Sequence, residues 1–510
     1  MKIKFISLIT ATVVVFSMSP ALAGDVIVKG GIAVVALENE PDVLDPTLAN
    51  TFISRVVFTS LCEKLYDVND KLQLIPQLAA ALPITSADGL TMDIKLRKGI
   101  KFNDGTPFDA NAVKVTLDRD KTMKTSARRP DLAAVDKVEV VNPLAVRLTL
   151  NKPYSPLVAQ LADRAGMIMS PTALAKLGDN FGTAPVCVGP FKFKNRVAGS
   201  EINLVKSDQY YDANKVNLDG IKYKFITDAN VRAANLRSGD VNVAERLNPS
   251  DAIELQKLPA IKILGVATLA YQGLTINVDP TKTNSALAKS VQLRKAFELS
   301  LDRKAINDVV FNGQNVPDCL PISTTSPFRP TSVTCSAFDP NAARKIVQAS
   351  GEKLPIPFDL MIPAGADSVK LGEVIQSMAN AVGFKVTVKP VEFLTSLTAG
   401  RAGKFDVYLI GWSGRIDPDG NLTGLVTTGG PNNFSQSRDP VLDALISKAA
   451  SFKGLNQRKG VYTRVFARLA QTVPNIYLYH DKWFLGLSGI TGVDYFGDAL
   501  PRFKTASMTK

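Results

Sequence analysis

The chain has 510 residues, of which 45% are hydrophobic and 21% are charged, an ordinary composition for a globular protein. Its net charge of +13 comes from scattered lysines and arginines, which does not indicate a nucleic-acid surface but can favour acidic ligands. A single histidine and the lack of clustered metal ligands argue against a metal centre, so we expect no metal and no cofactor.

The N-terminus has the pattern of a secretory signal peptide. Lys2 and Lys4 precede a short apolar stretch, and residues 1–23 end in Ala-Leu-Ala. The apolar stretch is shorter than the roughly 20 residues of a membrane span, which disfavours the alternative of a membrane anchor. We therefore expect cleavage before Gly24 and a soluble protein exported to the periplasm.

The four cysteines are even in number, and an oxidising compartment favours disulfides. Cys319 and Cys335 flank a proline-rich loop that a crosslink would hold in place. This leaves Cys62 to pair with Cys187. We favour these two bridges over a metal site because the chain has no C-x-x-C motif, although four cysteines allow three pairings and the sequence leaves the connectivity open.

The first two thirds of the chain mix short strands with helices. An edge strand running into a turn is expected soon after Gly24, and Asp109 is placed to cap a helix that begins at Ala110. The other elements expected from apolar periodicity are a helix over 52–66, strands over 90–97 and 135–151, a helix over 229–238, an extended segment over 269–280 and a helix over 291–312.

The stretch from residue 355 onward predicts a parallel α/β unit. Strands are expected over 355–363, 384–391 and 405–410, with helices over 371–382 and 393–403 between them. In open α/β sheets, ligands bind outside the carboxyl ends of the strands. The segment GWSGRIDPDGN at 411–421 follows the third strand directly, so we expect it to form the floor of a ligand site.

A hydrolase interpretation of this segment is weak. A nucleophile elbow needs G-x-S-x-G, but Arg415 stands where the final glycine would follow Ser413. The one histidine that could complete a triad, His480, lies in a strand-like stretch and is expected to be structural. We therefore predict no catalytic residue and no enzymatic activity.

The same residues suit a binding site. Trp412 offers an aromatic wall, Arg415 a planar donor for carboxylate or phosphate, and Asp417 an acceptor for an amine or hydroxyl. Ser413 and Gly414 lie between them, and glycine lets a backbone approach a ligand closely. The alternative is that Asp417 belongs only to a tight turn and Arg415 to a salt bridge.

At this point the chain resembles a known family, the family 5 solute-binding proteins of dipeptide, oligopeptide and nickel ABC transporters. The resemblance covers nearly all the mature sequence, and its motifs occur in order: VLDPTLANTFISRVVFTSLCEKLYD, LRKGIKFNDGTPFDANAVKVTLDR, APVCVGPFKF, LRKAFELSLDRKAINDVVFNGQ, FDVYLIGWSGRIDPDGN and PNIYLYHDKW. No single motif is decisive, but the collinear set is.

The resemblance implies an α/β fold: a two-lobed periplasmic binding protein of type II, cluster C, with an extra α+β domain inserted in the first lobe. The boundaries it implies are lobe I at 24–68, 188–277 and 487–510, the inserted domain at 69–187, and lobe II at 278–486. The chain would cross between lobes near 270–280 and 480–490. Tyr271 and Glu38 are then further candidate residues of the cleft wall.

One departure from the family pattern bears on the ligand. Peptide binders of the family commonly carry an aspartate three residues after the tryptophan, where it holds the N-terminal ammonium of the peptide. Here that position is Arg415, which cannot bind an ammonium group. Either Asp417 has taken over this role or the ligand is anionic at this point.

The function implied is a periplasmic receptor that captures a short peptide between its lobes and delivers it to an ABC importer. The alternative is a receptor of the same fold for a non-peptide solute: an amino-acid–sugar conjugate, an oligosaccharide or an anionic metal chelate. The expected partners are this ligand and the permease subunits in the inner membrane, with no nucleic acid, and the family fold works as a monomer.

Overall fold

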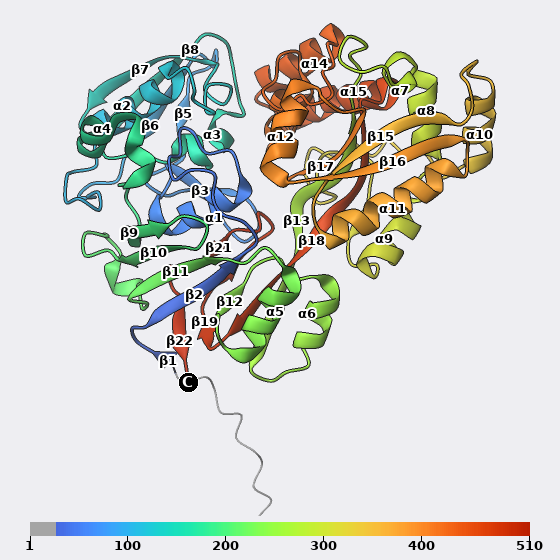
Figure 1. The fold of residues 1–510 in the computed structure, drawn as a ribbon. Coiled ribbons are helices and arrows are strands. Elements are labelled where there is room, and N and C mark those ends of the chain that lie inside the picture. The colour runs from blue at the N-terminus through green and yellow to red at the C-terminus, as the bar shows by residue number, and fades with distance from the viewer. Residues whose placement is uncertain (1–26) are drawn as a thin grey trace, which may run out of the picture.

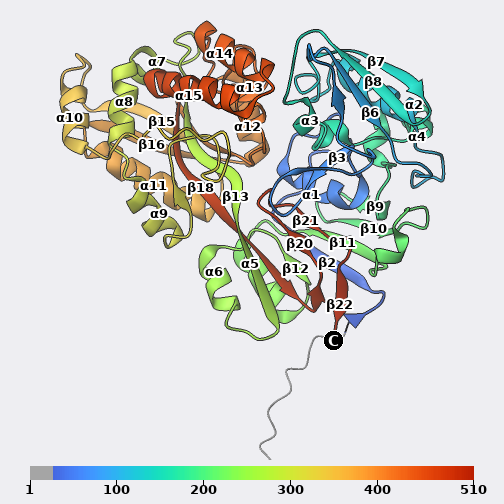
Figure 2. The same ribbon diagram turned by 180° about the vertical axis from the view of Figure 1, so that it is seen from behind.

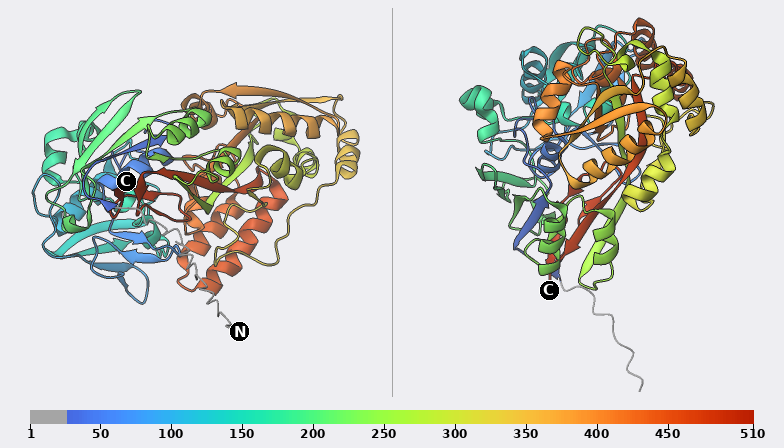
Figure 3. Two further views of the ribbon diagram at one scale, coloured as in Figure 1. Left: turned by 90° about the horizontal axis from the view of Figure 1, so that it is seen from below. Right: turned by 45° about the vertical axis from the view of Figure 1, so that its right-hand side comes forward.

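The computed structural model describes residues 27–510 and confirms the two-lobed α/β fold. The two lobes lie side by side, with the blue-to-green first part of the chain in one and the yellow-to-orange later part in the other (Figures 1 and 3). The expected signal peptide lies outside the described residues. Among residues 27–510, no helix has both the length and the apolar character needed to cross a membrane.

Two long antiparallel strands connect the lobes. They are β13 (Ile261–Ile276) and β18 (Asn475–Ser488), and they run together from one lobe into the other (Figures 1 and 2). They join the strands of both lobes into one sheet of order β16-β15-β17-β13-β18-β12-β2-β11-β10-β9, with β14 (Val316–Pro317) beside β18. The hinge of the molecule is therefore a pair of continuous strands.

Lobe I contains the strands at one end of this sheet, a three-stranded sheet of order β1-β22-β19 and the two-stranded ribbon β20-β21. Its strands are β2 (Ile32–Leu37), β9 (Phe191–Val197), β10 (Glu201–Lys206), β11 (Gly220–Phe225), β12 (Val243–Ala244), β1 (Ile27–Val28), β19 (Ile490–Thr491), β20 (Asp494–Tyr495), β21 (Pro501–Arg502) and β22 (Ser507–Thr509). Its helices are α1 (Phe52–Leu61), α5 (Ala229–Ser238), α6 (Pro249–Leu255) and the 3₁₀ turn Ala213–Lys215. The prediction of an edge strand soon after Gly24 is wrong about its position in the sheet. The strand β2 is internal, because it pairs with β11 on one side and β12 on the other.

The segment between α1 and β9 folds as a small sheet with helices. Its elements are β3 (Tyr66–Val68), β4 (Leu74–Pro76), β5 (Ile84–Thr85), β6 (Thr91–Lys95), α2 (Ala110–Thr122), β7 (Val135–Asn142), β8 (Ala145–Leu150), α3 (Leu157–Gln160), α4 (Pro171–Leu177) and the 3₁₀ turns Arg164–Gly166 and Gly178–Thr183. One apolar core runs through lobe I and this segment, from Val35 and Phe58 to Ile94 and Leu148. The exact domain boundaries given above stay a prediction.

Lobe II is built on the parallel unit predicted from the sequence. Strands β15 (Ile356–Pro363), β16 (Phe384–Val391) and β17 (Val407–Trp412) are parallel, with α11 (Ala366–Asn380) and α12 (Phe393–Ala402) between them. The remaining helices are α7 (Ala286–Lys289), α8 (Val291–Leu299), α9 (Arg303–Phe311), α10 (Pro340–Gln348), α13 (Asp419–Val426), α14 (Pro440–Ser451) and α15 (Leu455–Thr472). Because all three parallel strands end at one edge, residues after β17 reach the space between the lobes.

Capping decides where several helices begin and end. Asp109 accepts a hydrogen bond from the Ala112 amide at the start of α2, as predicted. The single helix expected over 291–312 is in fact two helices, α8 and α9, because Asp302 turns extended and caps a new helix. The helix expected over 52–66 ends at Leu61, where Cys62 is extended.

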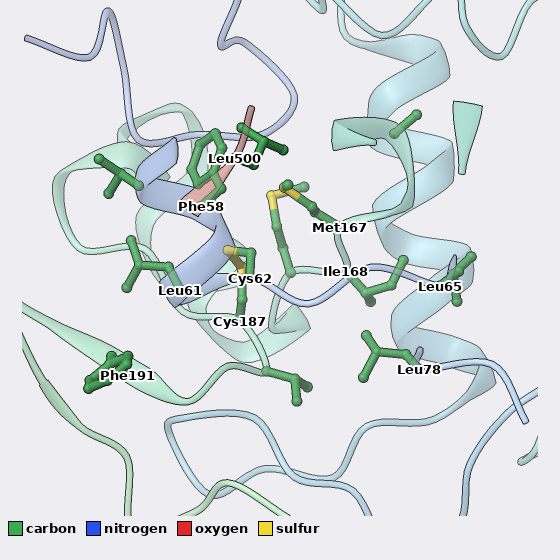
Figure 4. Packing of buried hydrophobic residues seen from close by; sticks show 14 of the residues in the cluster. Phe58, Leu61, Cys62, Leu65, Leu78, Met167, Ile168, Cys187, Phe191 and Leu500 are labelled. Carbon is green, nitrogen blue, oxygen red and sulfur yellow. A yellow bond between two sulfur atoms is a disulfide. The ribbon is translucent and has the colours of Figure 1, made fainter. Parts of the chain in front are cut away.

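Both predicted disulfides are present. Cys62 bonds to Cys187 and Cys319 to Cys335. The first lies among buried apolar side chains, including Phe58, Leu61 and Phe191, and ties the end of α1 to the segment before β9 (Figure 4). It thus closes the base of the inserted segment covalently.

Candidate functional site

A cavity of about 310 Å³ lies between the two lobes, beside the crossing strands. Lobe I, the crossing strands and lobe II all contribute to its wall. The lining side chains include acids, arginines and aromatic rings: Glu38, Phe52, Arg246, Tyr271, Tyr477, Asp481, Trp483, Arg401, Trp412, Ser413 and Phe434. Its volume is at the small end of the roughly 300–1,000 Å³ range of ligand pockets. The cavity is therefore the candidate ligand site of the protein.

Trp412 and Tyr271 reach the cavity from paired strands. Trp412 is the last residue of β17 and lies opposite Tyr271 of β13 in the antiparallel register. The Tyr271 ring packs edge-on against Tyr477 at 5.1 Å, and the Trp412 indole N–H donates to Asn421 Oδ1 at 3.2 Å. These fixed aromatic faces form the apolar wall of the site.

An acidic corner lies on the lobe I side of the cavity. Arg246 pairs with Glu38 at 3.0 Å and with Glu245 at 3.1 Å, and its guanidinium packs over the Trp483 ring at 3.8 Å. Asp481 also lines the cavity, and within residues 27–510 no lysine or arginine forms an ion pair with it. Two carboxyl groups therefore share one guanidinium, and the third, that of Asp481, has no such ion pair.

The pKa values of these acids reflect that imbalance. Burial raises the pKa of Glu245 to about 7, against the opposing effect of Arg246. Burial likewise raises the pKa of Asp481 to about 6, although Arg246, His480 and the Trp483 indole favour its charged form. A cation placed beside Asp481 would lower that pKa and stabilise the carboxylate.

Arg415 does not line this cavity, and its predicted contact with ligand stays a prediction. Its Nε lies 2.6 Å from Asp163 Oδ2, in the opposite lobe, and its guanidinium packs over the Trp412 ring at 4.7 Å. Its Nη1 also donates to the Gly414 carbonyl at 2.7 Å. The salt bridge considered from the sequence is the one present, and it crosses the cleft.

Asp417, also predicted to contact ligand, is held by another side chain, and its role in binding stays a prediction. Both of its oxygens accept from Arg458 at 2.7 Å, so the carboxylate is fully engaged inside lobe II. It lines neither the cavity described above nor its neighbour. Gly414 is likewise outside the lining, because its backbone packs against the carbonyl of Leu269 in β13.

Of the residues predicted for ligand contact, Glu38, Tyr271, Trp412 and Ser413 line the cavity together. That they touch ligand stays a prediction. The sequence analysis missed Asp481, although alternation along β18 gives a signal: His480 points into the protein, where its Nδ1 lies 2.9 Å from the Ala270 carbonyl, so its neighbour points to the cleft.

A second cavity, of about 260 Å³, adjoins the first. Its lining includes Arg415 and Asp163, and it shares residues with the first cavity. The shared residues are Asn50, Arg401, Trp412, Leu425 and Asn432. Trp412 therefore belongs to the walls of two adjoining cavities.

Two lobes joined by crossing strands, with a ligand-sized cavity between them, define a binding receptor of the ABC importer type. The model of the bacterial extracellular solute-binding proteins, family 5 Middle, matches residues 73–434. The chain belongs to this family. Proteins of this family are extracytoplasmic and work with ABC permeases. The relatives described below are transport proteins rather than enzymes.

Individual relatives bind different ligands. The glutathione-binding protein GsiB of Pectobacterium atrosepticum is 28% identical over 508 residues, 94% of each chain. The periplasmic binding protein DppA of Helicobacter pylori, in complex with the peptide STSA, has a TM-score of 0.85 at 22% identity, covering 94% of this chain and 99% of that one. AgaA of A. tumefaciens, in complex with agropinic acid, has a TM-score of 0.81 at 25% identity, covering 93% and 96%.

Proposed function

We propose that this protein is a periplasmic receptor for short peptides with a free amino end, which it delivers to an ABC importer. The observation that carries the proposal is the acidic corner inside the interlobe cavity. Glu38 and Asp481 line this corner; Glu38 is paired with Arg246, whereas within residues 27–510 no lysine or arginine pairs with Asp481, so the corner around Asp481 lacks a paired positive charge. The ammonium group of a peptide would supply it.

This assignment moves the ammonium site away from the position usual in the family. Arg415 occupies that position and is bound to Asp163, while Asp417 is bound to Arg458. Asp481, on the crossing strand β18, lines the cavity without an ion pair to a lysine or arginine of residues 27–510, so it can accept from a ligand. A charged hydrogen bond of this kind contributes about 1.5–3 kcal/mol.

The size and walls of the cavity fit a short peptide. A volume of about 310 Å³ suits a ligand of a few residues rather than a long chain. Tyr271, Trp412 and Trp483 provide flat apolar faces for its side chains and backbone. The glutathione-binding relative, which aligns over nearly the whole chain, supports a ligand of tripeptide size.

Closure of the lobes around the peptide would create the form that the permease recognises. Residues 1–23 have the pattern of a cleaved signal peptide, which supports export to the periplasm. The receptor acts as a monomer and performs no chemistry on its ligand.

An anionic non-peptide solute is the second candidate. It is favoured by the several arginines around the second cavity and by the AgaA structure, whose ligand is agropinic acid. In that case the carboxylates of the ligand would dominate binding and a free amino group would be dispensable.

Ligand-stripped protein tests the proposal by calorimetric titration with di- to tetrapeptides and their N-acetylated forms. We expect the free amino forms to bind at least about tenfold more tightly. Asp481→Asn should remove that preference, whereas Asp494→Asn, an exposed aspartate in lobe I, should keep it. Equal binding of free and acetylated peptides would contradict the ammonium site, and binding of non-peptide acids alone would establish the second candidate.

A further inference from the structure

The second cavity of the cleft is rich in arginine. Four guanidinium groups line it, from four separate segments: Arg128 follows α2, Arg164 begins a 3₁₀ turn, Arg401 lies on α12 and Arg415 follows β17. The first two belong to the lobe I side and the last two to lobe II. The positive charge therefore converges on the cavity from both lobes.

The aspartates nearby do not balance this charge. The carboxylate of Asp163 forms ion pairs with three arginines. The distances to their Nε atoms are 3.0 Å for Arg55, 2.6 Å for Arg415 and 3.9 Å for Arg164. Asp131 and Asp419 also line the cavity, and the Asp419 carboxylate accepts hydrogen bonds from the hydroxyl groups of Tyr154 and Thr423. Three aspartates therefore line the cavity against four arginines.

The two remaining arginines of the cavity differ in their pairing. Arg128 has a partner of its own, Asp131, at 2.7 Å. Within residues 27–510, Arg401 forms no ion pair. Arg401 therefore adds an unbalanced positive charge to the excess around Asp163.

Two of the arginines are buried with unused donors. The exposed fraction is 2% for Arg164 and 6% for Arg128, and the Nε of each has no hydrogen-bond partner. Burial first, and then the charge of Arg128, lowers the pKa of Arg164. Buried donors and buried positive charge are both unfavourable unless an acceptor meets them. A negatively charged ligand group would supply such an acceptor.

The same cavity adjoins the proposed peptide site. Arg401 and Trp412 line both compartments, so a ligand held beside Trp412 can extend a group past the indole toward the arginines. A carboxylate on a side chain or at a chain end is planar, and one guanidinium group can bind it through two parallel hydrogen bonds.

We propose that the cavity lined by Arg128, Arg164, Arg401 and Arg415 is an anion subsite that binds a second negatively charged group of the ligand. This inference rests on the proposed function, because the ligand is anchored by its ammonium in the acidic corner. The receptor then selects bipolar peptides: an amino end at Asp481 and an additional carboxylate among the arginines. A peptide with an acidic side chain is the substrate class.

Matched peptides test this directly. The probes are tripeptides that differ only by glutamate or glutamine at one position, scanned over all three positions, with the dissociation constant measured by calorimetry. We expect the glutamate peptide to bind at least about tenfold more tightly at one position. The preference should fall in Arg401→Gln, whose side chain is exposed, and in Arg128→Gln.

A control separates local binding from general charge. Arg464→Gln removes the same charge from the exposed surface of α15 and should leave the glutamate preference unchanged. Equal affinity for glutamate and glutamine peptides at every position overturns the anion subsite and leaves the peptide receptor intact. Failure of every peptide to bind overturns both proposals. Circular dichroism of each variant establishes that it is folded.

Discussion

Arg415 and Asp163 form an ion pair that spans the cleft between the lobes, with Nε and Oδ2 2.6 Å apart. A second contact lies beside it, where the hydroxyl of Tyr154 donates to Asp419 of lobe II. Both lobe II residues follow β17, in the segment that ends on the ligand site. The segment that forms one wall of the cleft therefore also fastens the lobes together.

Loss of this ion pair should open the receptor. In Arg415→Ala the closed form loses a charge-assisted contact, and ligand affinity falls with the closed population, by about tenfold. Asp163 keeps Arg55 as a partner, so the protein stays folded. Small-angle X-ray scattering should show a larger radius of gyration without ligand, and stopped-flow measurements a faster ligand dissociation. An unchanged radius of gyration and an unchanged dissociation rate would contradict a role of this ion pair in holding the lobes closed.

The Tyr154→Phe variant tests whether a residue that joins the two lobes acts through lobe closure or through direct contact with ligand. Tyr154 lines neither cavity, so its hydroxyl can influence binding only through the lobes. We expect faster ligand dissociation with an unchanged order of preference among peptides. The matched control is Tyr66→Phe, whose buried hydroxyl has no hydrogen-bond partner and faces no lobe contact. If the Tyr154 variant instead changes which peptide binds best, its side chain acts on the ligand.

Ligand affinity should depend on pH through Asp481. Its pKa is raised to about 6 by burial, and only the ionised carboxylate attracts an ammonium group. Binding is then strongest above pH 6 and weakens as the pH falls, by about tenfold at pH 5. Calorimetry between pH 5 and pH 8 measures this.

Another acid titrates nearby, so a variant must isolate the effect. Burial raises the pKa of Glu245 to about 7, and Glu245 lies in the same corner beside Glu38 and Arg246. The Asp481→Asn protein keeps all of them and should lose most of the dependence below pH 6. If its pH profile matches the parent, another group controls the affinity.

The lobe II architecture could be predicted because its signals are local. Apolar periodicity and the order of strands and helices fixed β15 through β17, and hence the position of the segment after Trp412. The partners of that segment could not be predicted in the same way. Asp163 and Arg458 meet Arg415 and Asp417 only after the chain has folded, and nothing in their local sequence marks them.

The acidic corner illustrates an intermediate case. Alternation along β18 was sufficient to place Asp481 on the cleft face, yet its importance depends on Arg246 and Glu38, which come from distant segments. The disulfides were predictable because few pairings exist for four cysteines and the compartment is oxidising. The split of the helix over 291–312 was missed because a capping aspartate outweighed a continuous apolar stripe.

The two disulfides should contribute unequally to stability. The bridge from Cys62 to Cys187 closes a loop with a sequence separation of 125, and that from Cys319 to Cys335 one of 16. Loop-closure entropy then predicts how far each double alanine variant lowers the free energy of unfolding. The decrease is about 5 kcal/mol for the first pair and about 3 kcal/mol for the second. Urea denaturation gives both free energies of unfolding. A larger loss for the short loop would show that contacts, not chain entropy, dominate.

Gly414 holds the floor of the cleft against β13. Its φ is +73°, and a Cβ at this position would lie 2.2 Å from the Leu269 carbonyl oxygen. Gly429 has a similar φ of +74° but open space around it. Alanine at Gly429 should therefore cost only the left-handed strain of about 1–2 kcal/mol, whereas Gly414→Ala must also displace the chain from β13.

That displacement would move Trp412 and Arg415 together, because both lie within two residues of Gly414. We expect Gly414→Ala to lower the free energy of unfolding more than Gly429→Ala and to weaken ligand binding, while Gly429→Ala leaves binding intact. Urea denaturation and calorimetry on the two variants measure both effects. Equal stability and equal affinity would mean that the segment can shift without consequence, so that close packing on β13 does not set the geometry of the site.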